Sequence, residues 1–128
     1  MSGEEKDNIR AELARRELAR RHYGEYLAYT QGESWIKTRM SEFLAARVQA
    51  FLEEKSGNAY DLLLIETPPQ HGKTLTVTET LPSWYLGKNP RGRVILASYN
   101  ENSAQRFCRR NREKLMRFGE TVFGIRPG

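Results

Sequence analysis

The chain has little of what several classes of protein require. Its 128 residues contain one cysteine, Cys108, which excludes an intramolecular disulfide or a multi-cysteine metal site and indicates a reducing, cytosolic compartment. No apolar run approaches the roughly 18 residues of a membrane helix, and the charged residues 1–21 lack the apolar segment of a secretory signal. A chain of this length, 38% hydrophobic and 29% charged, is expected to form one soluble domain or part of one.

Positive charge is unevenly spread along the chain. Residues 1–60 carry ten basic and ten acidic side chains, whereas residues 61–128 carry eleven and six, which accounts for the whole net charge of +5. Residues 106–117 alone hold six basic residues and a single acid, Glu113. A local basic block of this kind favours a polyanionic partner.

Helical patterns are found at both ends of the chain. Residues 4–29 favour helix, although arginines interrupt their apolar stripe. Ser34 is a candidate N-cap for a second helix to about Lys55, because apolar residues recur along it with a period of 3.6. A last helix is expected to begin at Asn100 or Ser103 and to end near residue 118.

Two short apolar runs predict strands. Residues 62–65 and 94–97 are continuous in apolar side chains, as is typical of strands that are buried on both faces of a parallel sheet. A helix is expected between them from about Lys73, kinked or ended by Pro82. The predicted fold class is therefore α/β, with a right-handed βαβ unit, N-terminal helices and an incomplete parallel sheet.

The loop before that central helix resembles a phosphate-binding loop. Its sequence is Thr67-Pro68-Pro69-Gln70-His71-Gly72-Lys73-Thr74, and the last three residues are those that end a P-loop. In such a loop glycine lets the backbone approach a phosphate, lysine reaches the β- and γ-phosphates, and threonine binds Mg²⁺ through its hydroxyl. The loop therefore predicts binding of ATP with Mg²⁺. The alternative is an ordinary turn with a solvated lysine, and the leading glycine of the motif is replaced by Thr67.

Basic residues of the last predicted helix share one side of it. At about 100° per residue, five of them fall within an arc of about 140°. These five residues are Arg106, Arg109, Arg110, Lys114 and Arg117. The arc favours contact with the DNA backbone or with a protein partner, and a solvated amphipathic face is the alternative. The opposite side is mainly apolar and includes Cys108, which is expected to be a buried thiol.

Longer strings around these motifs are similar to the start of the large terminase subunit of tailed bacteriophages. The similarity spans roughly residues 35–125. It is carried by Pro68-Pro69-Gln70-His71-Gly72-Lys73-Thr74, by Thr78-Glu79-Thr80-Leu81-Pro82-Ser83-Trp84-Tyr85-Leu86-Gly87-Lys88-Asn89-Pro90, by Arg93-Val94-Ile95 and by Ser98-Tyr99-Asn100. The resemblance implies a P-loop NTPase-type motor that packages double-stranded viral DNA into a procapsid. It also implies a small terminase subunit and a portal as partners, and the cytoplasm of a bacterial host as the location.

The resemblance also assigns roles to single residues. It implies that Gln70, His71, Gly72, Lys73 and Thr74 form the nucleotide-binding loop, in which His71 either contacts a phosphate or, as is favoured, caps the turn. Many relatives carry an arginine where this chain has Gln70, which leaves the source of that charge open. The family's adenine-binding segment lies upstream of the loop, which makes Tyr26 and Tyr29 candidates for lining it.

The expected domain organisation follows from the same resemblance. Residues 1–33 are predicted to form a helical arm, and residues 34–128 the first portion of a P-loop ATPase domain. The only acids after Lys73 are Glu79, Glu101, Glu113 and Glu120, so neither a Walker B pair nor an RNase H-like nuclease triad is expected. The chain is therefore predicted to be a terminase fragment or a truncated prophage product that is inactive alone. The alternative is a non-catalytic module that binds DNA or a packaging partner through residues 103–118.

Overall fold

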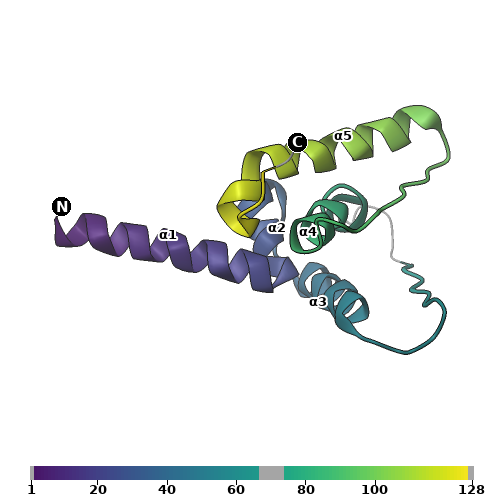
Figure 1. Cartoon of the computed structure of the whole chain (residues 1–128), viewed down its shortest axis with the longest axis horizontal. Coiled ribbons are helices and arrows are strands. Elements are labelled where there is room, and N and C mark those ends of the chain that lie inside the picture. Colours follow the sequence, from purple (N-terminus) through teal and green to yellow (C-terminus); the bar gives the residue numbers. More distant parts are fainter. Residues whose placement is uncertain (1, 67–73, 127–128) are drawn as a thin grey trace.

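The computed structural model describes residues 2–66 and 74–126, and every regular element in this part of the chain is a helix. Four α-helices gather together, and the long first helix projects away from them (Figure 1). In chain order the elements are α1 (Gly3–Arg21), α2 (Tyr23–Gln31), η1 (Gly32–Ser34), α3 (Arg39–Glu53), η2 (Thr74–Thr78), α4 (Leu81–Lys88), α5 (Glu101–Phe118) and η3 (Gly119–Phe123).

The predicted strands are absent from the described residues, so the α/β class with a βαβ core and a parallel sheet is wrong. Residues 62–65 and 94–97 have no regular secondary structure and pair with no other described segment. In the first run Leu63 and Ile65 pack against the helical core, whereas Leu62 is 85% exposed. In the second run Ile95 is 92% exposed.

The physical reason lies in what a parallel sheet needs. Strands of such a sheet are buried on both faces, and two strands joined by one helix leave two open edges and one uncovered face. The apolar surface of this chain is instead buried where helices pack on helices around the aromatic residues of α2 and α4.

Side chains that cap the backbone explain where the helices begin. Asn100 accepts a hydrogen bond from the N–H of Ser103 at 2.7 Å and starts α5, as the sequence predicts. α3 begins four residues later than predicted, after Thr38, which forms a capping box with Ser41. Ser34 does not cap α3, because its hydroxyl donates to the backbone carbonyl of Gln31 at the end of α2.

A break at His22 separates the projecting helix from the core. α1 is polar on almost all sides, and Ala19 is its one buried residue. Its arginines form ion pairs along the helix with Glu12 and Glu17. At His22 the backbone is extended, with φ −125° and ψ 120°, and α2 then enters the core with Tyr23. The arginines that interrupt the apolar stripe of α1 therefore leave most of it in solvent.

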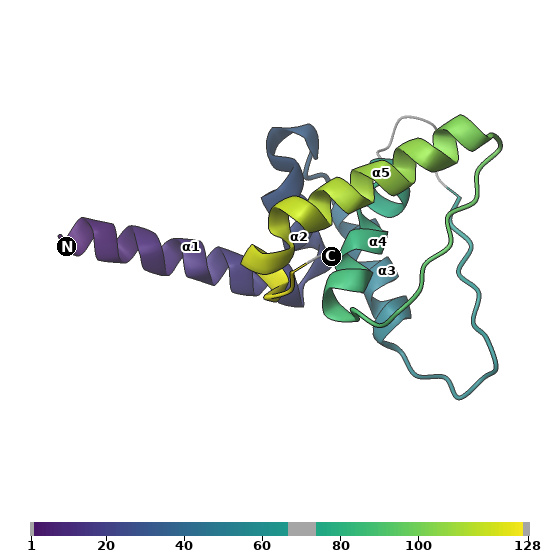
Figure 2. The same ribbon diagram turned by 45° about the horizontal axis from the view of Figure 1, so that its top comes forward.

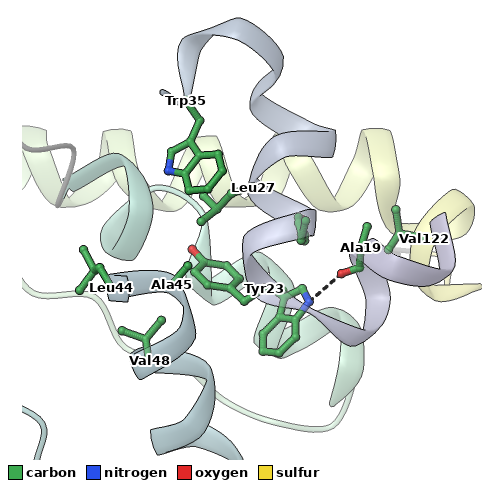
Figure 3. Packing of buried hydrophobic residues seen from close by; sticks show 10 residues of the cluster. Ala19, Tyr23, Leu27, Trp35, Leu44, Ala45, Val48 and Val122 are labelled. Atoms are coloured by element: carbon green, nitrogen blue, oxygen red, sulfur yellow. Dashed lines mark hydrogen bonds between the residues drawn. The ribbon is translucent and has the colours of Figure 1, made fainter. Parts of the chain in front are cut away.

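An aromatic cluster holds the helices together (Figure 3). Trp84 of α4 is 2% exposed, and its indole N–H donates to the carbonyl of Ala19 at 3.0 Å, the dashed line in Figure 3. Its ring centroid lies 5.3 Å from that of Tyr23. Leu44 and Val48 of α3 complete the cluster from the other side. Trp84 thus joins α4 to the end of α1, because it both fills the core and satisfies a carbonyl near the helix terminus.

Pro82 begins a helix instead of ending one. The helix expected from about Lys73 is, in the described residues, the five-residue π-helix η2, followed by a turn and then by α4. Pro82 lies in the first turn of α4, where its missing N–H leaves no helix hydrogen bond unmade. The turn between η2 and α4 contains Glu79 and Thr80, and both are buried.

Candidate polyanion-binding site

The five basic residues predicted to share one arc of α5 border a single hollow in the surface, of about 490 Å³. We call it the basic hollow. Its residues from α5 are Arg106, Arg109, Arg110, Glu113, Lys114, Arg117 and Phe118, and its residues from α2 are Thr30 and Gln31. Five cations and one carboxylate thus meet in one concave surface, which favours an anionic ligand.

Asn111 fixes the orientation of α5. Its side chain is buried, and its Nδ2 donates to the carbonyl of Thr78 at 2.9 Å. Its Oδ1 accepts from the backbone N–H of Ser83 at 3.1 Å. Phe107, one turn earlier, is also buried. This side of α5 therefore docks against the turn between η2 and α4, along α4 (Figure 2), and the basic arc lies at the border of the contact.

Two of the five cations contact Glu79 in that turn. The guanidinium of Arg110 lies 3.4 Å from the Glu79 carboxylate, which is 12% exposed. The ammonium of Lys114 donates to the backbone carbonyl of Glu79 at 3.1 Å. Burial lowers the pKa of Lys114, and the nearby charge of Glu79 opposes this effect.

The other three cations form no ion pair within the part of the chain that the structure describes. The guanidinium of Arg106 lies 5.2 Å from the centre of the Phe107 ring, and that of Arg117 lies 5.0 Å from the centre of the Phe118 ring. Contacts of this kind leave the outer N–H groups free to donate to a ligand. Arg106, Arg109 and Arg117 are therefore available to an anion.

The prediction that Cys108 is a buried thiol is wrong, because the residue is exposed. The buried side of α5 is centred between Phe107 and Asn111. Cys108 lies about 100° around the helix from Phe107. The buried side of α5 is narrow, so Cys108 lies outside it. The apolar pattern predicts which side of the helix is buried, but not how wide the contact is.

Of the residues predicted to bind nucleotide, one lies in the described part of the chain. Gln70, His71, Gly72 and Lys73 lie outside the described residues. Thr74 is the first residue of η2, and its side chain is exposed. η2 itself is held from the core side, since the hydroxyl of Tyr23 donates to the carbonyl of Thr76 and the indole of Trp35 donates to the Thr76 hydroxyl at 3.3 Å.

The two tyrosines suggested for an adenine site have other partners. Tyr26 is fully buried, and its hydroxyl is 2.8 Å from the Ser83 hydroxyl, so the suggestion is wrong for this residue. Tyr29 donates to the carboxylate of Glu12 at 2.6 Å. That hydrogen bond is the largest cause of the lowered pKa of Glu12, and contacts with neighbouring arginines lower it further. Residues 2–66 and 74–126 contain no group of three or more His, Cys, Asp or Glu side chains that could hold a metal ion.

Sequence reasoning missed two residues that orient α5 or contact the cations of the hollow. Asn111 is a polar residue on the otherwise apolar side of α5, and that mismatch is a signal for a buried hydrogen-bonding role. Glu79 carries no comparable signal, because its importance comes from the turn that places it beside Arg110 and Lys114.

A helix that brings five cations to one concave surface is typical of proteins that contact polyanions. The family comparison points to one class of such proteins. Residues 64–126 match the family described as terminase large subunit, T4likevirus-type, N-terminal. This segment, which contains η2, α4 and α5, is therefore similar to the N-terminal part of large terminase subunits, as the resemblance indicates. No curated protein and no solved structure matches the chain. Within the described residues, no helix has the length and apolar character needed to cross a membrane.

Proposed function

We propose that this chain serves the packaging of phage DNA and that the basic side of α5 contacts the DNA backbone. The observation that carries the proposal is the meeting of five cations in the basic hollow, three of them without an ion-pair partner in the described part of the chain. Similarity to the terminase family supports DNA as the polyanion. Contacts to phosphate hold the duplex without reading its sequence, so this binding is sequence-independent. A small terminase subunit and a portal are the proposed protein partners.

Salt dependence tests the DNA contact. Replacing Arg106, Arg109 or Arg117 by alanine should reduce the slope of log K against log salt by ~0.9 for each phosphate contact that is lost. Arg112→Ala is the matched control, because Arg112 lies on the same helix and outside the basic hollow. If all four variants keep the wild-type slope, α5 does not contact DNA. The helix is then a protein contact or a solvated face.

The second part of the proposal is that residues 67–74 bind ATP with Mg²⁺. Its support is the run Gly72-Lys73-Thr74 together with the family match. Thr74 fits the role, since its exposed side chain is accessible to a ligand. The dipole of an α-helix can favour an anion at its N-terminus. η2 gives no such support, because it has only five residues and is not an α-helix.

Each residue of the proposed loop has a distinct task. Lys73 neutralises phosphate charge, the hydroxyl of Thr74 is a ligand for Mg²⁺, and Gly72 permits close approach of the backbone. Gln70 and His71 complete the loop. ATP supplies the phosphoryl group and Mg²⁺ neutralises its charge, and the chain's own residues hold and orient them.

A nucleotide titration tests the loop. Lys73→Ala should weaken binding of Mg-ATP by ~1.5–3 kcal/mol, which corresponds to about 10- to 150-fold, because a charge-assisted contact is lost. Lys88→Ala is the control, since Lys88 lies over the ring of Trp84 at 4.2 Å and far along the chain from the loop. Equal affinity of wild type and the Lys73 variant would remove the proposed site.

A further inference from the structure

Glu79 is placed where it can oppose an anionic ligand of the basic hollow. It engages two of the five cations at once, Arg110 through its carboxylate and Lys114 through its backbone carbonyl. Its carboxylate is the partner in the only ion pair that the hollow's five cations form within the described residues. A DNA phosphate that approached Arg110 would therefore meet a carboxylate already in place.

The contact between Glu79 and Arg110 is of a kind that a phosphate can replace. The distance is 3.4 Å, and the Arg110 side chain is 49% exposed, so solvent weakens the pair and the guanidinium can be reached from outside. A phosphate offers more negative charge and several acceptor oxygens to the same guanidinium, and arginine binds phosphate through two parallel hydrogen bonds. The contact between Lys114 and the backbone carbonyl does not depend on the carboxylate charge.

The docking of α5 does not depend on this ion pair either. Asn111 fixes the helix through hydrogen bonds to the backbone of Thr78 and Ser83, and Phe107 is buried beside it. Loss of the Glu79 charge should therefore leave the hollow in place and change only its electrostatics.

We propose that Glu79 is an internal competitor of DNA: its carboxylate holds Arg110 in the free protein, and a backbone phosphate takes its place in the complex. This inference rests on the proposed contact between α5 and DNA. In this proposal Glu79 lowers the affinity of the basic hollow for DNA. It does not position the site for its ligand. Arg110 then contributes one phosphate contact that is made only after its bond to Glu79 is broken.

The test is Glu79→Gln, which keeps the shape of the side chain and removes its charge. Binding of a labelled duplex is measured by fluorescence anisotropy over a range of salt concentrations. We expect the variant to bind about 3- to 10-fold more tightly at low salt, because Arg110 is released to contact a phosphate. Glu120→Gln is the matched control, since Glu120 is exposed, pairs with Arg126 at 3.7 Å and lies outside the hollow.

A double-mutant cycle separates the specific effect from a general effect of charge. In an Arg110→Ala background, Glu79→Gln should give no further gain, because the guanidinium that it releases is absent. The inference is overturned if Glu79→Gln binds DNA no more tightly than wild type, if Glu120→Gln gives an equal gain, or if the gain persists without Arg110.

A single variant gives a second test that does not require the Glu79 variant to fold. Arg110→Ala should reduce the salt slope by ~0.9, because Arg110 contacts a phosphate in the complex, and an unchanged slope overturns the inference. Failure of the inference is distinguishable from failure of the proposed function. In the first case Arg106, Arg109 and Arg117 still govern the salt slope and only the Glu79 and Arg110 results differ. In the second case none of these arginines matters, and the inference is overturned as well.

Discussion

Tyr26 is a core residue with a buried hydroxyl group. It is fully buried, and its hydroxyl lies 2.8 Å from the hydroxyl of Ser83. Burial raises the pKa of Tyr26 to about 12, although the hydrogen bond with Ser83 opposes the shift. Burial also raises the pKa of Tyr23, which lies beside it. Both residues therefore favour the folded state only while they remain protonated.

The pH dependence of stability follows from these shifts. The unfolded chain releases the tyrosine proton near pH 10 and the folded chain only near pH 12, so the unfolded state binds fewer protons in between. The free energy of unfolding should therefore fall as pH rises from 10 to 12, with about 2–3 kcal/mol of the loss due to Tyr26. Denaturant unfolding at a series of pH values measures the loss.

Variants at two tyrosines isolate this contribution. Tyr26→Phe should cost about 1 kcal/mol at neutral pH through the lost hydrogen bond and should make the alkaline decline less steep, with Tyr23 contributing to the decline that is left. Tyr60→Phe is the matched control, because Tyr60 is 83% exposed and should behave as wild type. An alkaline decline of the same steepness in Tyr26→Phe would show that burial of this hydroxyl is not its cause.

Two glycines show how packing between elements decides whether a helix tolerates a side chain. A Cβ added at Gly87 in α4 would lie 2.3 Å from the ring of Phe123, with three ring atoms too close at once. A Cβ added at Gly24 in α2 would meet only the Cβ of Ala45, at an ordinary 3.7 Å. Gly87 therefore marks a close approach of η3 to α4, whereas Gly24 does not mark a comparable constraint.

Alanine at these two positions should have opposite effects. Gly87→Ala should destabilise the protein by about 1–3 kcal/mol, since overpacking outweighs the gain in helix propensity. Gly24→Ala should be neutral or stabilising by up to about 1 kcal/mol, because only the propensity changes. Thermal or denaturant unfolding of both variants measures the difference. If Gly87→Ala is as stable as Gly24→Ala, the contact between α4 and η3 is looser than described.

At the scale of elements, the sequence predicted most of the helical segments, but the two strands that it predicted are absent from the described residues. The start of α5 was predictable because Asn100 caps it through a local hydrogen bond. Residues 62–65 and 94–97 have the composition of buried strands, but a strand needs a partner, and no local pattern supplies one. The start of α3 was missed because the hydroxyl of Ser34 has a competing backbone partner, the carbonyl of Gln31 at the end of α2.

For the whole molecule we predict that the chain alone does not hydrolyse ATP at the rate of a motor. Phosphoryl transfer needs one carboxylate to hold the metal and another group to orient water. In the described residues Glu79 is engaged with Arg110, and no cluster of metal-binding side chains is present. Phosphate release should therefore stay near that of a Lys73→Ala blank, with DNA present. Strong turnover that depends on Lys73 would contradict this prediction and would identify a carboxylate with a role that the structure does not indicate.

Part of the candidate site could be predicted from the sequence. Helical spacing grouped the five cations of α5, because their angles around a helix follow from sequence alone. The role of Glu79 was not predictable, and the buried position of Asn111 was signalled without its partners, because these contacts depend on where the turn between η2 and α4 meets α5. The predicted nucleotide loop stays a prediction, supported by the residues Gly72-Lys73-Thr74 and by the family.

The unpaired segments at 60–66 and 93–98, which have no regular secondary structure, have a consequence for hydrogen exchange. Within the described chain, none of their amides donates to a backbone carbonyl, whereas the N–H groups in the helices are bonded. Exchange with deuterated water should therefore be fastest in two of the most apolar runs of the chain and slow in α2 and α4, which line the core. Mass spectrometry of peptic peptides would show this reversal of the usual relation between apolar sequence and protection.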